Sequence, residues 1–312
     1  MSSERHHLRQ QAATAASIDL AEEDASENPY EPPLSRAQAY IASPKYKLSE
    51  LNVIRDWLQT HVLPVKHPIE ARRGYWTFTK NKVRNAKRVG TANRAGASGV
   101  SLDPDFVHRN SGSGTSSTQQ LEMEDSSYEK ASWRFLFECA RNGRLDLCFE
   151  MCKEMNQSWK AASLRGGLLY GNPLLALDEE DDTQEGASSA AVGNRKRALW
   201  KAVCRKLASE HTADSYECAL YGSLGGELAP VLQVSHSWEE HLWAFINASF
   251  EAKLDQLLDS GGSDGKNWWC GKQDEAGETG SQAEDGKLRG LASLTLKDIF
   301  ERLEQTNTDN IQ

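Results

Sequence analysis

Residues 128–155 read YEKASWRFLFECARNGRLDLCFEMCKEM and carry the clearest structural signal in the chain. Apolar side chains recur at helical spacing up to Cys139, and they recur again from Leu145 to Met155 at i, i+3, i+4, i+7 and i+10. The pair Asn142-Gly143 separates the two runs, and this pair favours the left-handed conformation that ends a helix. Two helices joined by so short a connection predict an antiparallel helical hairpin.

Capping signals indicate further helices on both sides of this hairpin. Serine, threonine or aspartate followed three residues later by an acidic residue is typical of a helix start. Such pairs occur at Ser126/Glu129, Asp214/Glu217, Ser237/Glu240 and Thr295/Asp298, and Ser43-Pro44 begins an apolar run that Pro64 ends. Residues 74–79 alone have strand-like character, and one strand cannot form a sheet. We therefore predict an all-α fold.

Two of the expected helices carry more apolar surface than one face can bury. The helix over 238–257 has one stripe of Trp238, Leu242, Phe245 and Ser249 and a second of Trp243, Ile246, Phe250, Leu254 and Leu257. Helices covered on two sides are typical of stacked helical hairpins, so we predict an irregular α-solenoid. We expect part of the second stripes to face a partner, and the candidate interface residues are Trp133, Phe137, Trp243, Ile246 and Phe250.

Composition indicates that part of the chain does not pack. Hydrophobic residues make up 38% of the 312 residues, and the mean hydropathy is -0.64. We predict a disordered N-terminal tail at 1–42, a helical scaffold domain at 43–304 and a C-terminal tail at 305–312. Within the scaffold domain we expect low-complexity insertions near 90–126, 176–193 and 259–289.

Several classes of protein are disfavoured by the sequence. The six cysteines lack the spacing of a disulfide framework, which favours a reducing compartment. The longest apolar run, Leu242 to Ile246, is too short for a transmembrane helix. No HExxH, P-loop, GxSxG or CxxC pattern occurs, so we expect no catalytic residues, no cofactor and no small-molecule substrate. Cys148 and Cys152 fall on the apolar stripe, where core packing is favoured over a metal site.

A basic segment at 66–94 departs from the net charge of -9. It carries nine lysines and arginines against one acid, with Tyr75, Trp76 and Phe78 among them, which is a pattern found in nucleic-acid-binding proteins. A contact with an acidic protein surface or a plain solvated face explains it as well. Trp268 and Trp269 lie in a Gly/Asp/Glu-rich stretch and fit either a docking element or packing onto the helices.

The sequence resembles the 107-kilodalton nucleoporin family, whose fungal member is the 84-kilodalton nucleoporin. The resemblance covers about residues 48–303. The matching runs are Asp56-Trp-Leu58, Arg73-Gly-Tyr-Trp76, Leu102-Asp-Pro-Asp105, Tyr128-Glu-Lys130, Cys139 to Leu145, Trp159 to Gly167, Gly193-Asn194, Ala198 to Lys201, Tyr216 to Gly226, Ser237 to Ala244 and Leu296 to Phe300.

This resemblance implies a non-enzymatic helical scaffold of the Y-shaped complex in the outer ring of the nuclear pore, with the ancestral coatomer element fold. Such a protein lies at the nuclear envelope and supports pore assembly, mRNA export and protein transport. The implied partner is a stem nucleoporin of the 96-kilodalton or 145C type. The chain stops at Gln312 and looks truncated, so we do not expect the contact that the family's C-terminal tail makes with the 133-kilodalton nucleoporin. The alternative is a nucleic-acid-binding adaptor that uses segment 66–94.

Overall fold

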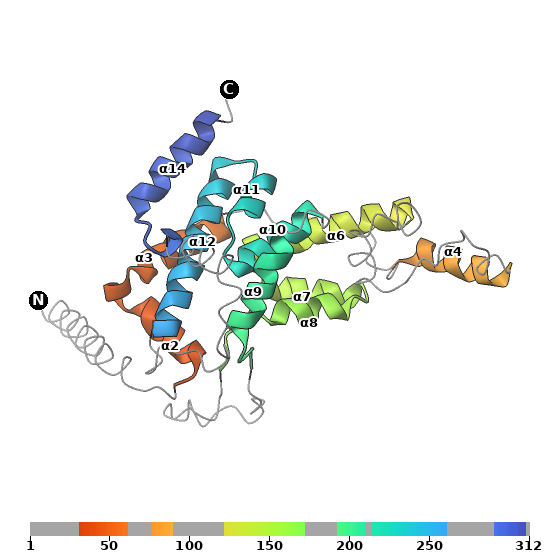
Figure 1. Cartoon of the computed structure of the whole chain (residues 1–312), viewed down its shortest axis with the longest axis horizontal. Coiled ribbons are helices and arrows are strands. Elements are labelled where there is room, and N and C mark those ends of the chain that lie inside the picture. Colours follow the sequence, from red (N-terminus) through yellow and green to blue (C-terminus); the bar gives the residue numbers. More distant parts are fainter. Residues whose placement is uncertain are drawn as a thin grey trace, which may run out of the picture. The chain divides into compact units, whose positions relative to one another are not determined.

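The computed structural model describes residues 31–61, 76–89, 122–171, 192–209, 214–260 and 290–309. Within these ranges the chain is helical apart from turns, and two isolated β-bridges join Leu169 to Asn194 and Gly171 to Val192 (Figure 1). The prediction of an all-α fold is confirmed. The elements are α2 (Pro33–Ala42), η1 (Pro44–Tyr46), α3 (Leu48–Thr60), α4 (Thr77–Arg88), α6 (Met123–Arg141), α7 (Leu145–Glu154), α8 (Ser158–Arg165), α9 (Arg197–Ala208), α10 (Ser215–Gly225), α11 (Ala229–Val234), α12 (Trp238–Ser260) and α14 (Leu296–Asp309).

The chain divides into two compact units. Unit 1 comprises Met1–Trp57, Gly166–Trp200 and Leu242–Gln312, and unit 2 comprises Leu58–Arg165 and Lys201–His241. Within unit 1, both predicted stripes of α12 are buried from Leu242 to Leu254, as their two-sided apolar pattern requires. The first residue of that pattern, Trp238 in unit 2, is exposed instead.

The predicted hairpin is formed by α6 and α7 in unit 2. Gly143 adopts a φ of +71°, and its amide donates to Ala140 O at 3.0 Å while the Arg144 amide donates to Cys139 O at 2.9 Å. A left-handed residue followed by this bonding pattern satisfies the last carbonyls of a helix. Cys148 and Cys152 are buried and free, in agreement with their expected place in the core.

Three of the four predicted capping residues cap their helices, and two of them exchange both predicted bonds with the acidic residue three positions later. Glu240 N donates to Ser237 Oγ at 3.2 Å while Glu240 Oε2 accepts from Ser237 N at 3.4 Å, and Thr295 and Asp298 exchange the equivalent bonds. Asp214 accepts from Tyr216 N at 2.9 Å. The fourth prediction was wrong. Helix α6 begins at Met123 rather than after Ser126, and the Glu129 carboxylate accepts from Gln157 and Lys160.

The structure corrects four further expectations. Residues 305–309 of the predicted C-terminal tail belong to α14. Residues 33–42 of the predicted tail form α2, whose Arg36 Nη2 donates to Leu258 O of α12 at 3.0 Å, a contact that local sequence cannot reveal. Residues 77–79 of the run expected to be strand-like form the start of α4. The helix expected from Ser43 is interrupted at Lys47, which has a φ of +53°, so that α3 begins at Leu48. Most of the predicted insertions and both Trp268 and Trp269 lie outside the described residues.

Candidate functional site: charged and aromatic contacts that join the helices

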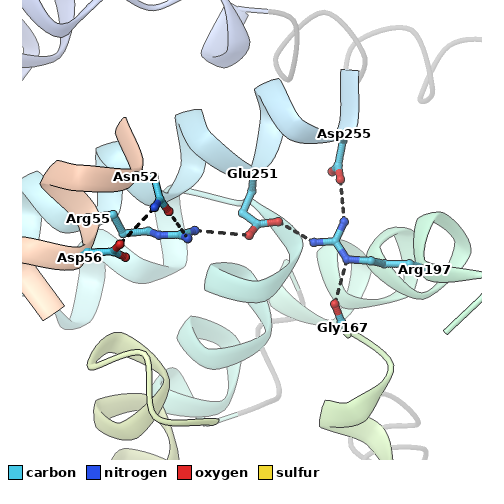
Figure 2. Close-up of polar contacts among 7 residues, drawn as sticks. All are labelled: Asn52, Arg55, Asp56, Gly167, Arg197, Glu251 and Asp255. Carbon is cyan, nitrogen blue, oxygen red and sulfur yellow. Dashed lines mark hydrogen bonds and ion pairs between the residues drawn. The ribbon is translucent and has the colours of Figure 1, made fainter. Parts of the chain in front are cut away.

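Helix α12 carries two carboxylates, one turn apart, that two arginines from distant segments approach (Figure 2). Arg197, the first residue of α9, donates through Nη2 to Glu251 Oε2 at 2.7 Å and through Nη1 to Asp255 Oδ1 at 2.8 Å. The Nη1 atom of Arg55 on α3 lies 3.9 Å from Glu251 Oε1. These four side chains, which we call the α12 charge junction, connect α3 and the start of α9 to α12 within unit 1.

Each arginine of the junction is held by a further contact. Arg197 Nε donates to the carbonyl oxygen of Gly167 at 2.8 Å. Arg55 Nη2 donates to Asn52 Oδ1 at 2.9 Å, and its guanidinium lies 3.8 Å from the centroid of the Phe250 ring. Both groups are thereby fixed in one orientation.

Burial acts on both arginines, but with different results. Burial lowers the pKa of Arg55, and Glu251 and Asp56 offset this only in part. For Arg197, burial also acts to lower the pKa, but the Glu251 and Asp255 carboxylates outweigh it and the pKa is raised. A guanidinium stays protonated in either case, so the junction acts as a fixed ionic contact and cannot exchange protons with a substrate.

A second joint in unit 1 is formed where residues 166–171 meet residues 192–197. Asn194 donates through Nδ2 to Gly166 O and through its backbone amide to Leu168 O, both at 3.0 Å. A Cβ on Gly166 would lie 2.2 Å from the Trp200 ring, and one on Gly193, at a φ of +92°, would lie 2.0 Å from Leu169 O. Glycine is therefore required at both positions.

Unit 2 has a buried polar cluster centred on Lys160 of α8. Lys160 Nζ donates to Glu129 Oε1 at 2.5 Å and to Ser132 Oγ at 3.1 Å, and it lies 3.8 Å from the Trp133 ring centroid. Gln157 Nε2 donates to Glu129 Oε2 at 3.0 Å. Burial lowers the pKa of Lys160, and Glu129 opposes that shift. This cluster joins α6 to α8 by a paired, desolvated charge.

Glu217 of α10 faces the same cluster. Burial raises its pKa to about 7, and Lys160 opposes this rise. Glu217 was predicted only as a capping residue, and its burial beside charged side chains of α6 and α8 could not be seen from a local motif.

Helix α4, the described part of the basic segment, is capped by a residue from another helix. Asp125 of α6 accepts from Thr79 N at 2.6 Å and from Phe78 N at 3.4 Å, while Thr79 Oγ1 accepts from Glu122 N at 3.2 Å. Trp76 Nε1 donates to Glu129 Oε2 at 3.3 Å. The first turn of α4 is thus fixed to the first two turns of α6, a relation that no short motif reveals.

The five predicted interface residues are all buried by the chain's own helices. Trp133, Phe137, Trp243, Ile246 and Phe250 have exposed fractions between 0% and 4%. Trp133 packs edge-on to Trp159, with the ring centroids 6.3 Å apart, and Phe137 lies near Tyr216. Their role as partner contacts stays a prediction, and it requires a partner to replace contacts that the chain now makes with itself.

The apolar side chains that a partner can reach lie elsewhere. Val53 and Trp57 of α3 are exposed by 66% and 49%, and they occupy one helix face at i and i+4. Trp57 falls within the apolar run that follows Ser43, but periodicity alone does not separate the inner face of a helix from the outer one.

The described residues give no indication of a metal centre or a membrane span. Within the described ranges, no group of three or more histidines, cysteines, aspartates or glutamates could hold a metal ion. Among the helices searched there, none combines the length and the apolar character needed to cross a bilayer.

Comparison with known proteins assigns this architecture to a family. A family model described as "Nuclear pore protein 84 / 107" matches residues 4–312. The chain is 28% identical over 263 residues to nucleoporin nup107 of Schizosaccharomyces pombe, and the match covers 83% of this chain and 28% of that protein. It is 25% identical over 267 residues to nuclear pore complex protein Nup107 of Mus musculus, covering 83% of this chain and 26% of that one.

A third relative is nucleoporin NUP84 of Chaetomium thermophilum, which is 26% identical over 244 residues, with 69% of this chain and 24% of that protein covered. The chain thus spans about a quarter of the length of the curated relatives it matches. Because the family model matches almost the whole chain, this protein belongs to the nuclear pore protein 84 / 107 family.

Proposed function

We propose that the chain is a structural element of the nuclear pore scaffold, in the Y-shaped complex of the outer ring, where it supports pore assembly, mRNA export and protein transport. The observation that carries this proposal is the family match over residues 4–312, together with relatives named as nuclear pore proteins. The proposal includes location at the nuclear envelope and a role without catalysis.

The contacts of the described helices support a mechanical role. The charged side chains of the α12 charge junction and of the Lys160 cluster bond to one another and to backbone groups. Such contacts fix helices relative to their neighbours within each unit, and a structural scaffold requires helices held in fixed positions.

The proposed partner is another scaffold nucleoporin, chiefly a stem subunit of the 96-kilodalton or 145C type. The exposed pair Val53 and Trp57 offers a contact of the kind found at the centre of protein interfaces, where tryptophan is enriched. The relatives are named as pore proteins, and the comparisons lend no support to the alternative of a nucleic-acid-binding adaptor.

A localisation experiment tests this function. The full chain is fused to a fluorescent protein and expressed in eukaryotic cells beside a marker of the nuclear pore. We expect a rim at the nuclear envelope that coincides with the marker. A Val53→Asp/Trp57→Asp variant with wild-type helicity should no longer accumulate at the nuclear rim. Diffuse fluorescence of the unmodified chain would contradict the proposal.

A further inference from the structure

Helix α4 concentrates positive charge in a chain that is otherwise acidic. Its twelve residues contain five cations and no acid, against a net charge of -9 for the whole chain. Lys80, Arg84 and Arg88 recur at i, i+4 and i+8, so they lie along one side of the helix. Like charges at this spacing repel one another and disfavour an isolated helix. An anionic partner would remove that cost.

The helix is nevertheless held in a defined position. Its first turn is bound to α6 through Asp125 and Glu122, and Lys82 pairs with the Glu122 carboxylate. Beyond this contact α4 extends away from α6 (Figure 1). Arg84 and Arg88 are exposed there, and among the described residues neither has an acidic partner. A rigid base therefore presents two uncompensated guanidinium groups to solvent.

We propose that the exposed side of α4 carrying Arg84 and Arg88 docks an acidic segment of a partner protein, with carboxylates spaced to match arginines one turn apart. Guanidinium groups pair with carboxylates in bidentate geometry, and charge complementarity of this kind governs the choice of partner. This inference goes beyond the proposed function, since it assigns a surface and the chemistry of the partner that the surface fits.

Two observations favour a protein over nucleic acid or a membrane. The aromatic side chain of α4, Phe78, stands in the anchored first turn, so the outer part of the helix offers no platform for stacking bases. The exposed apolar residues Phe78 and Val89 stand at the two ends of the basic stretch, so they do not form the continuous apolar face that an interfacial helix inserts into lipid.

The test measures binding of the full chain to a labelled helical peptide built from Glu-Ala-Ala-Ala repeats, whose carboxylates recur at i and i+4. Fluorescence anisotropy is recorded for the wild type, for Arg84→Glu/Arg88→Glu and for the control Lys130→Glu/Lys153→Glu. The control changes two other exposed cations of unit 2 and alters the net charge equally. A milder Arg84→Gln/Arg88→Gln variant covers the case in which charge reversal unfolds α4.

We expect the wild type to bind the peptide, and both arginine variants to weaken binding by about tenfold or more, while the lysine control stays within about twofold. Binding should also weaken as salt is added. The inference is overturned if the wild type fails to bind the peptide or if the lysine control loses as much affinity. It is also overturned if a single-stranded RNA of equal charge, or vesicles containing phosphatidylserine, bind more tightly than the peptide through the same arginines.

Discussion

Arg197 and Glu251 stand 54 residues apart in the sequence and share a 2.7 Å ion pair between Nη2 and Oε2, with both side chains largely withdrawn from solvent. Glu251 also faces Arg55, so one carboxylate on α12 compensates two arginines from different segments. Removal of that single carboxylate takes the α12 ion-pair partner from Arg55 and leaves Arg197 with Asp255 alone.

Glu251→Gln is therefore expected to lower the free energy of unfolding by about 3 kcal/mol, because breaking a buried ion pair leaves an uncompensated charge. Asp255→Asn should cost less, since Arg197 keeps Glu251. The exposed pair Lys297/Glu301 supplies the control, and Glu301→Gln should change stability by no more than about 0.5 kcal/mol. Urea unfolding followed by circular dichroism measures all three, and equal losses for Glu251→Gln and Glu301→Gln would rule out a buried junction.

Much of this architecture could be predicted from local patterns. The α6/α7 hairpin and three N-capping residues follow from short motifs, because capping bonds form within four residues. The α12 charge junction could not be predicted, since a lone arginine or glutamate in a helix looks like a solvated residue until its partner is known. The same holds for Asp125, which caps α4 from another helix.

The sequence did not show which apolar helix faces the chain itself covers and which remain open to a partner. A second apolar stripe indicates that a helix is covered twice, but it does not distinguish the chain's own helices from a partner. In this structure the chain itself covers Trp243 and Phe250, whereas Trp57 is half exposed. The residue composition of the two faces is too similar for periodicity to separate them.

Trp133 packs between helices and beside the Lys160 ammonium group. Trp133→Ala should lower the free energy of unfolding by ~3–5 kcal/mol, the range found when a large core side chain is removed. Trp159→Ala serves as the comparison and should cost less, because Trp159 is partly exposed. A loss below about 0.5 kcal/mol for Trp133→Ala would instead mark Trp133 as a surface residue.

Stability should decrease as pH rises through the range in which Glu217 ionises. The folded pKa of about 7 lies above the ordinary value of 4.5, so the folded chain binds the proton more tightly than the unfolded chain between these values. Protonated Glu217 contributes roughly 3 kcal/mol to the free energy of unfolding. This contribution is fully present below pH 4.5 and is lost as pH rises through about 7. The free energy of unfolding, measured across this pH range, should decrease in the wild type and stay level in Glu217→Gln. An identical pH profile for the two proteins would contradict the prediction.

Gly193→Ala should disrupt the joint between residues 166–171 and 192–197. The added Cβ would lie 2.0 Å from Leu169 O at a φ that disfavours alanine, so we expect a loss of more than about 1 kcal/mol. Gly290→Ala is the matched control, because no atom lies within 4 Å of its added Cβ. Thermal unfolding compares the two, and an unchanged midpoint for Gly193→Ala would show that the joint tolerates a side chain.

The proposed scaffold role is tested most directly by light scattering during size-exclusion chromatography of the full chain, alone and mixed with the crown region of a 96-kilodalton or 145C-type stem nucleoporin, at low and high salt. We predict a one-to-one complex that persists at high salt, because apolar contacts are not screened as exposed charges are. A helical monomer that elutes unchanged beside the stem nucleoporin at both salt concentrations would contradict the proposed role.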